Sequence, residues 1–125
     1  MRHYDTIAEF EREGYDVIVD KTWEDLNPRD CFDDTQFDIA EMLHNIEHGN
    51  LDWFMMRVRV LAEGVELGSA YLGGMLYEDA AEVLKDGSME DMLHEAMLEA
   101  KSNVYRVYKK FAALNEELER EGIAQ

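Results

Sequence analysis

Two histidines and a glutamate form the sharpest candidate for chemistry in this chain. They occur in the run His44-Asn45-Ile46-Glu47-His48, so the two imidazoles are four residues apart. Side chains at positions i and i+4 of a helix share a face, and two imidazoles so placed can hold one metal ion with a distant acid as third ligand. Glu47 would then be the general base. The spacing defines a candidate metal site.

The helix that carries the pair argues against a metal. The pattern H-x-x-E-H occurs in one class of zinc metallopeptidases, but those enzymes are large and the rest of the chain supplies no further part of one. With about 100° per residue, the apolar face of residues 37–48 turns His44 and His48 toward solvent. Positive charge is also favourable there, near a helix C-terminus. We interpret the histidines as exposed helix-end residues, and a small metal-dependent enzyme as a lesser alternative.

Three aspartates and one cysteine are the other candidates for chemistry. Asp30, Asp33 and Asp34 offer the oxygen ligands that calcium and magnesium prefer. Their segment lacks a D-x-D-x-D-G run, so turn formation and helix capping explain them better. Acidic neighbours disfavour a thiolate at Cys31, and no glycine-rich phosphate loop is present. We expect no catalytic residue, no metal and no cofactor, and therefore no enzyme.

Charge is the most unusual property of the chain. Its 125 residues carry 29 acids against 12 lysines and arginines, a net charge of −17. Residues 1–50 hold 14 acids and 4 bases, residues 51–100 hold 11 and 3, and residues 101–125 hold 4 and 5. Such a field repels nucleic acid and anionic membranes and attracts basic protein surfaces. We expect no direct binding of nucleic acid or membrane, and a basic protein as partner.

The acids of the first half are the candidates for contact with that partner. One cysteine cannot form an internal disulfide, and neither a leader-like start nor an apolar span of about 20 residues is found, which favours a cytoplasmic protein. Residues 24–36 show no period, and so long an irregular segment is more often functional than a short turn. The predicted partner-binding acidic surface comprises Glu9, Glu13, Asp16, Asp25, Asp30, Asp33, Asp34, Asp38 and Glu41.

The elements that position these residues are read from periodicity. Ile7 and Phe10, three residues apart ahead of Gly14, predict a helix over residues 6–13. Residues 15–23 are rich in β-branched and aromatic side chains on alternate positions, which predicts a strand.

A loop, a second helix and a hairpin follow. The loop covers residues 24–36, and residues 37–48 have the apolar spacing of a helix. Residues 51–62 and 65–77 flank a Glu-Gly pair and predict a β-hairpin, with a bulge at the two adjacent glycines of its second strand. Residues 79–85 predict one or two helical turns.

The longest predicted element is a C-terminal helix. The run Ser88-Met89-Glu90-Asp91 resembles a capping box, so we expect the helix to begin at Ser88 and to reach about Arg120, on the order of 50 Å away. The fold class is α+β, with a small three-stranded antiparallel sheet packed with helices. We expect a single acidic domain over residues 1–125, in which residues 1–87 form the helix-strand-helix-hairpin portion and 88–121 the long helix.

Apolar residues recur along that helix in steps of four and three. They are Leu93, Met97, Ala100, Val104, Val107, Phe111, Leu114 and Leu118. A sustained repeat of 3.5 residues is typical of helices that pack on other helices. The predicted self-association seam of a homodimer is Val104, Val107, Phe111, Leu114 and Leu118. The alternative is a seam that rests entirely on the chain's own sheet and first helices.

One block of the chain resembles a class of small accessory proteins. Residues 51–54 (LDWF), 57–60 (RVRV) and 67–77 (LGSAYLGGMLY) carry the resemblance. It is to small acidic proteins of phages and other mobile elements. Such proteins are similar in size and charge to inhibitors of host defence, of the anti-CRISPR and anti-restriction type, some of which imitate DNA. The resemblance implies no defined set of functional residues.

Two classes of function follow. The first is a non-enzymatic inhibitor whose carboxylates block a basic nucleic-acid-binding surface of a defence complex, with DNA mimicry as its most specific form. A groove built for phosphates, about one per 1.7 Å of duplex axis, gains similar Coulomb energy from carboxylates at comparable spacing. The alternative is a dimeric structural or adaptor protein without mimicry, in which high acidity serves solubility.

Overall fold

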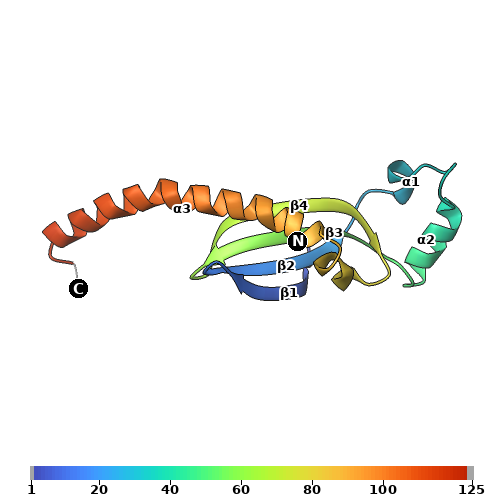
Figure 1. Cartoon of the computed structure of the whole chain (residues 1–125), viewed down its shortest axis with the longest axis horizontal. Coiled ribbons are helices and arrows are strands. Elements are labelled where there is room, and N and C mark those ends of the chain that lie inside the picture. Colours follow the sequence, from blue (N-terminus) through green and yellow to red (C-terminus); the bar gives the residue numbers. More distant parts are fainter. Residues whose placement is uncertain (1, 124–125) are drawn as a thin grey trace.

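A four-stranded antiparallel sheet crossed by one long helix makes up the fold (Figure 1). The computed structural model describes residues 2–123. The strands are β1 (Asp5–Arg12), β2 (Tyr15–Trp23), β3 (Asp52–Ala62) and β4 (Val65–Tyr77), in the spatial order β1-β2-β3-β4. The helical elements are α1 (Pro28–Cys31), α2 (Ile39–Glu47), the 3₁₀ helix η1 (Ala80–Leu84) and α3 (Ser88–Arg120). The class is α+β, but the prediction of three strands is wrong.

The additional strand is β1, where the spacing of Ile7 and Phe10 predicted a helix over residues 6–13. β1 pairs with β2 along its whole length, apart from a one-residue bulge near its start. The turn between the two strands consists of Glu13 and Gly14, both with positive φ, at 54° and 85°. Two such residues form the tight turn whose twist suits a hairpin. Pairing with a neighbouring strand therefore outweighs a weak local helical pattern.

The predicted bulge in β4 is confirmed at the glycine pair. The register between β3 and β4 shifts by one residue at this point. Gly74 has a φ of 66°, and its N–H donates to the Glu24 carboxylate at 2.7 Å. A Cβ at Gly73 would lie 2.5 Å from the same carboxylate. Glu24 therefore holds the bulge in place.

The N-termini of α1, α2 and α3 can each be compared with the prediction for their segment. The segment predicted to be a loop over residues 24–36 contains α1, whose cap Asn27 accepts from the Arg29 N–H at 3.0 Å. The predicted second helix is α2, and its cap Asp38 accepts from the Glu41 N–H at 3.1 Å. The predicted capping box at Ser88 is wrong, because the cap of α3 is Gly87 and forms no side-chain hydrogen bond.

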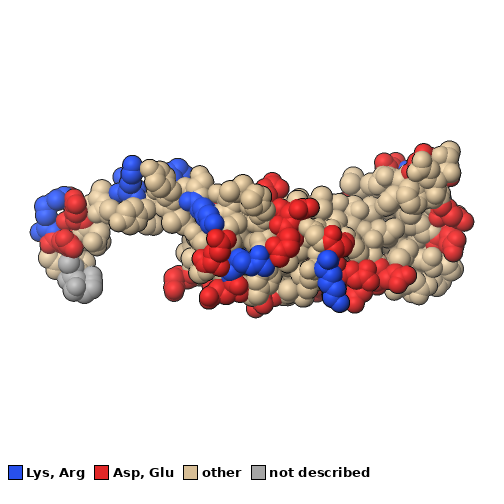
Figure 2. Space-filling view, viewed as in Figure 1, with Lys and Arg blue, Asp and Glu red and all other residues tan. Residues whose placement is uncertain are grey.

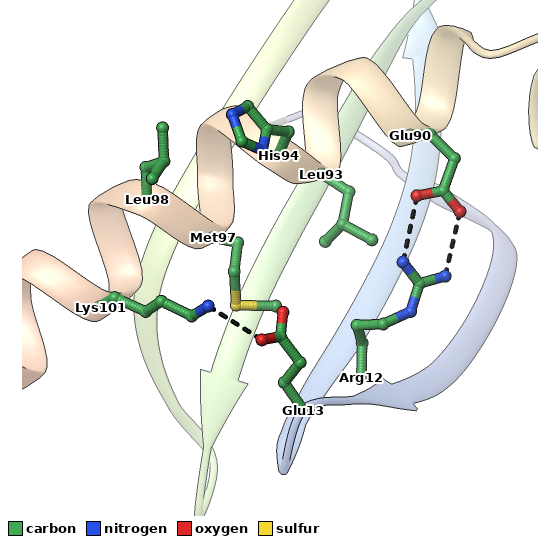
Figure 3. Close-up of a pocket in the computed structure, with 8 residues that line it drawn as sticks. All are labelled: Arg12, Glu13, Glu90, Leu93, His94, Met97, Leu98 and Lys101. Carbon is green, nitrogen blue, oxygen red and sulfur yellow. Dashed lines mark hydrogen bonds and ion pairs between the residues drawn. The ribbon is translucent and has the colours of Figure 1, made fainter.

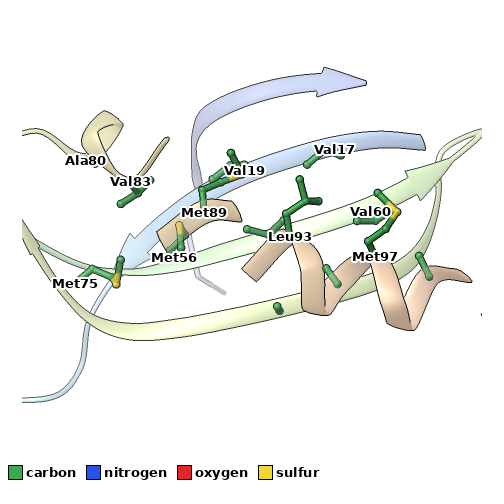
Figure 4. Close-up of a cluster of buried hydrophobic side chains, with 14 of the residues drawn as sticks. Val17, Val19, Met56, Val60, Met75, Ala80, Val83, Met89, Leu93 and Met97 are labelled. Carbon is green, nitrogen blue, oxygen red and sulfur yellow. The ribbon is translucent and has the colours of Figure 1, made fainter. Parts of the chain in front are cut away.

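The core lies between the sheet and α3, with η1 at its edge (Figure 4). Strand residues Val17, Val19, Val58 and Val60 are at most 1 % exposed. Met56, Met75, Met89 and Met97 fill the space between them and the helix, as flexible unbranched side chains can. The helix comes closest at Gly68, where a Cβ would lie 2.2 Å from the carbonyl oxygen of Ala96.

α3 is longer than the sheet it crosses. Its buried residues end at Ala100, and none of residues 101–123 is buried. We call residues 101–121, which include the C-cap Glu121, the arm and residues 2–100 the body. Figure 1 shows the arm extending beyond one end of the sheet, while α1 and α2 lie beyond the other end.

Candidate functional site

The nine predicted acidic residues are all exposed, but seven of them are divided between two regions and the other two form ion pairs within the molecule. Asp16 is the second residue of β2 and Trp23 the last, a separation of about 23 Å at 3.3 Å per residue. Figure 2 shows acidic groups along the body and at the end where α1 and α2 lie, and several basic groups on the arm. The chain therefore has two acidic regions instead of one surface.

The first region, which we call the acidic corner, consists of Glu9, Glu11 and Asp16. Glu11 lies directly opposite Asp16 in the β1–β2 pair, and Glu9 lies opposite Ile18. Residues opposite each other in antiparallel strands share a face, and here it is the outer face, turned away from α3. None of the three carboxylates forms an ion pair with the described residues.

Apolar side chains lie beside these carboxylates. Leu61 is the partner of Asp16 on β3, and Ile18 is the next outer-face residue along β2. A surface hollow of about 390 Å³ is lined by both of them together with Glu9 and Asp16. Such a hollow suits the aliphatic stem of an arginine or lysine, whose charged end would then meet the carboxylates.

The bases of the outer face do not neutralise the corner, because they bind a buried aspartate. Asp20 is 2 % exposed and accepts from Arg57 Nε at 3.0 Å and from Arg59 Nη2 at 3.3 Å. The Arg57 guanidinium also lies 3.5 Å from the centre of the Tyr4 ring. Burial lowers the pKa of Arg57, but the hydrogen bond and charge of Asp20 outweigh it and leave that pKa raised.

The second region, the acidic end, consists of Asp30, Asp33, Asp34, Asp38 and Glu41. Two of these residues stabilise local structure, since Asp38 caps α2 and Asp33 accepts from the Thr35 N–H at 2.9 Å. That backbone hydrogen bond holds the pKa of Asp33 below its usual value. The side chains of Asp30, Asp34 and Glu41 form no ion pair within residues 2–123.

The two remaining predicted acids pair within the molecule. Asp25 forms an ion pair with Arg2 and accepts from Trp23 Nε1 at 2.7 Å. Glu13 accepts from Lys101 at 2.9 Å. Both pairs are exposed, so they contribute little to stability, but they leave these two carboxylates less available to a partner.

A small hollow lies between the β1–β2 turn and α3 (Figure 3). Two ion pairs cross it: Arg12 binds both carboxylate oxygens of Glu90, at 3.0 and 3.1 Å, and Lys101 binds Glu13. The hydrogen bond and the charge of Arg12 hold the pKa of Glu90 below its usual value. The hollow measures about 170 Å³, which is below the ~300 Å³ of small ligand sites. Its ion pairs link the end of β1 and the β1–β2 turn to α3.

The histidine pair is exposed, as the helical wheel predicted. The imidazole centres of His44 and His48 lie 4.0 Å apart, and His48 Nδ1 lies 2.8 Å from the His44 carbonyl oxygen. Within residues 2–123, no three His, Cys, Asp or Glu side chains lie close enough together to hold a metal ion. Cys31 is exposed at the end of α1.

The edge of the sheet divides the heptad pattern of α3, and the whole predicted seam lies on the arm. Leu93, Met97 and Ala100 are at most 5 % exposed, so the first half of the heptad pattern packs on the chain's own sheet. On the arm, the exposed fractions are 38 % at Val104, 63 % at Phe111, 46 % at Leu114 and 41 % at Leu118, and Val107 is half-buried.

Glu11 belongs to the corner and was missed in the sequence because its segment was assigned to a helix. The strict alternation of Glu9, Glu11 and Glu13 is a period of two, and it is the signal that could have found the strand.

Comparison of the chain with protein-family models, with curated proteins and with solved structures found no match. No helix within residues 2–123 combines the length and the apolarity that crossing a membrane requires.

Proposed function

We propose that the chain is a non-enzymatic acidic binding protein whose body occupies a basic, nucleic-acid-binding surface of a partner protein. The acidic corner carries the proposal. Glu9, Glu11 and Asp16 are held on paired strands, so their spacing is fixed before binding, and fixed groups lose little entropy when a partner arrives.

The corner also carries an electrostatic cost that a basic partner would remove. Like charges directly opposite each other in a sheet, as Glu11 and Asp16 are, destabilise it by about 0.2–1 kcal/mol. An arginine or lysine of a partner placed between them turns this repulsion into attraction. Its stem would lie on Ile18 and Leu61, which are already beside the carboxylates.

The resemblance to acidic accessory proteins of phages suggests the kind of partner. A host defence complex of the CRISPR or restriction type offers a basic groove built for nucleic acid, in the cytoplasm. Inhibition of such a complex would require the chain to compete with its DNA or RNA, and imitation of the phosphate spacing is the most specific form of that competition.

The test compares two variants that change the charge equally. The corner variant carries Glu9→Gln, Glu11→Gln and Asp16→Asn. The control variant carries Glu78→Gln, Glu82→Gln and Glu95→Gln, three exposed acids of the body that lie outside both acidic regions. Each chain is immobilised, and the retained host proteins are measured by mass spectrometry. We expect the corner variant to hold its basic partner about tenfold more weakly, or ~1.4 kcal/mol, and the control variant to match the wild type. Equal retention by all three chains would rule out the corner as the binding site.

A dimeric adaptor without mimicry is the second candidate, and the exposed seam of the arm favours it. In that case the body would bind its partner through the loop of residues 24–36 or through a sheet edge. Such binding would persist as salt rises from about 0.1 to 1 M, where the Debye length falls from ~10 to ~3 Å. Binding through the corner would weaken steeply over the same range.

A further inference from the structure

The arm presents an apolar seam that no element within residues 2–123 covers. The heptad spacing runs through α3 without a break, yet the sheet covers it only as far as Ala100. Beyond that residue Val104, Phe111 and Leu114 are each more than a third exposed. A helix of about 20 residues is marginal in water unless its apolar face is packed. The sequence thus maintains a packing surface that the body does not use.

Charge along the arm is arranged in two blocks of opposite sign. Residues 101–115 contain four bases and no acid, whereas residues 116–121 contain four acids and one base. Two arms that run in opposite directions place each basic block beside the acidic block of the other copy. Two arms that run in the same direction place like charges together, and they also bring two bodies of net charge −18 side by side.

We propose that two copies of the chain associate through their arms as an antiparallel pair of helices. The exposed large apolar side chains of the body are spread over strands, loops and the first half of α3, whereas those of the predicted seam follow one another on a single helix. The residues of the body are Trp23, Leu26, Phe37, Val65, Tyr71, Leu72 and Leu98. The apolar face of α2, with Ile39 and Met42, is buried.

The charge blocks and the seam together define a register. Phe111 packs against the partner's Leu114, and Val107 against the partner's Leu118. Lys110 then lies beside the partner's Glu117, and twofold symmetry forms this ion pair twice. The paired segment covers residues 104–121, about 27 Å of helix. It ends before the residues of α3 that touch the sheet, so neither arm collides with the other body.

The first test is the mass of the purified full chain in solution. Sedimentation equilibrium at about 100 µM, well above a micromolar dissociation constant, should give a dimer. Phe111→Ser should raise the dissociation constant at least tenfold. Near-ultraviolet circular dichroism of Trp23 and Trp53, which both lie in the body, provides the folding control, since Phe111 lies outside the core. A wild-type monomer at this concentration, whatever else the arm then binds, would overturn the proposal.

The second test reads the direction of the helices by mixing variants. Lys110→Glu alone and Glu117→Lys alone should each weaken self-association about tenfold, because like charges then face each other. A mixture of the two variants should restore wild-type affinity by forming mixed dimers, since both pairs are again of opposite sign. In a parallel pair Lys110 and Glu117 do not meet.

The matched control exchanges the same charges on the outside of the helix. Lys109 and Glu116 each precede this pair by one residue and point away from the seam, so Lys109→Glu mixed with Glu116→Lys should show no preference for mixed dimers. The antiparallel arrangement would be contradicted if the mixture of variants at Lys110 and Glu117 preferred mixed dimers no more than the control mixture does. Both tests use purified chain alone, so they succeed or fail independently of the proposed partner.

Discussion

Gly68 is the residue at which the sheet and α3 approach most closely. Its φ is not in the left-handed region, so space rather than backbone conformation requires glycine. A Cβ there would meet backbone atoms, 2.2 Å from the Ala96 carbonyl oxygen and 2.8 Å from the Ala100 nitrogen. The backbone of α3 cannot adopt another rotamer as a long side chain can, so α3 as a whole would have to move away from β4.

Gly68→Ala should therefore destabilise the protein. Overpacking typically costs about 1–3 kcal/mol of unfolding free energy, and displacement of the helix places this substitution at the upper end. The neighbour Ser69→Ala, on the opposite side of β4, is the control and should change stability by less than ~0.5 kcal/mol. Urea denaturation of both variants measures the difference. Equal stability would mean that α3 does not rest on β4 at this point.

The ion pair of Arg12 and Glu90 predicts a pH dependence. The pKa of Glu90 is lower in the folded chain than its ordinary value of 4.5, so the folded state binds fewer protons near that pH. The stabilisation is complete above 4.5 and is lost as the pH falls through the folded-state pKa.

We expect Glu90→Gln to be less stable than the wild type at neutral pH. The difference should vanish as the pH falls through the folded-state pKa of Glu90, and the comparison cancels the general effect of protonating the other acids. Thermal melts of both chains at pH 7, 5 and about 3 measure it. A difference that stays constant with pH would show that the ion pair does not stabilise α3.

At the scale of elements, two turns share the dipeptide Glu-Gly but differ in what the sequence around them predicts. Long alternating segments flank Glu63-Gly64 and predict a hairpin, whereas the residues before Glu13-Gly14 have the spacing of a helix. Both glutamates have a positive φ, 51° at Glu63 and 54° at Glu13. The prediction of a helix over residues 6–13 is wrong because this segment is short and fits both the helical and the strand period. Only pairing with β2 decides between the two.

The long helix was predictable, but its division into body and arm was not. Heptad spacing is the same on both sides of Ala100, so the sequence cannot show where the sheet ends. That position depends on how β4 is placed under α3, with Gly68 against Ala96. The two acidic regions were likewise hidden, because they lie at opposite ends of β2 although both belong to the first 41 residues.

Hydrogen exchange should separate the two halves of α3. Amides of residues 89–100 should exchange slowly at every protein concentration, because the sheet packs against them. Amides of residues 104–120 should be protected only when the arms are paired, since an unpaired helix of this length is marginal. Dilution below the dissociation constant, or Phe111→Ser at any concentration, should make them exchange fast. Arm protection that ignores dilution would show that the arm is stable alone.

At the scale of the whole molecule, the two proposals would place partner binding on the body and self-association on the arm. The bodies carry the negative charge, and the arms are almost neutral. An antiparallel pair of arms would hold two acidic bodies at opposite ends of a rod, several Debye lengths apart at physiological salt. Such a dimer would present its acidic corner twice, and a partner with two basic sites would be bound with avidity.

Competition by nucleic acid tests whether the chain occupies a nucleic-acid-binding surface of its partner. The captured partner is loaded on the immobilised chain, and a duplex DNA of about 20 base pairs is then added. A basic groove built for nucleic acid binds the phosphates of such a duplex. A neutral polymer at the same mass concentration is the control. We expect release by the duplex and no release by the polymer. A partner that stays bound in the presence of excess duplex would contradict binding through a nucleic-acid surface.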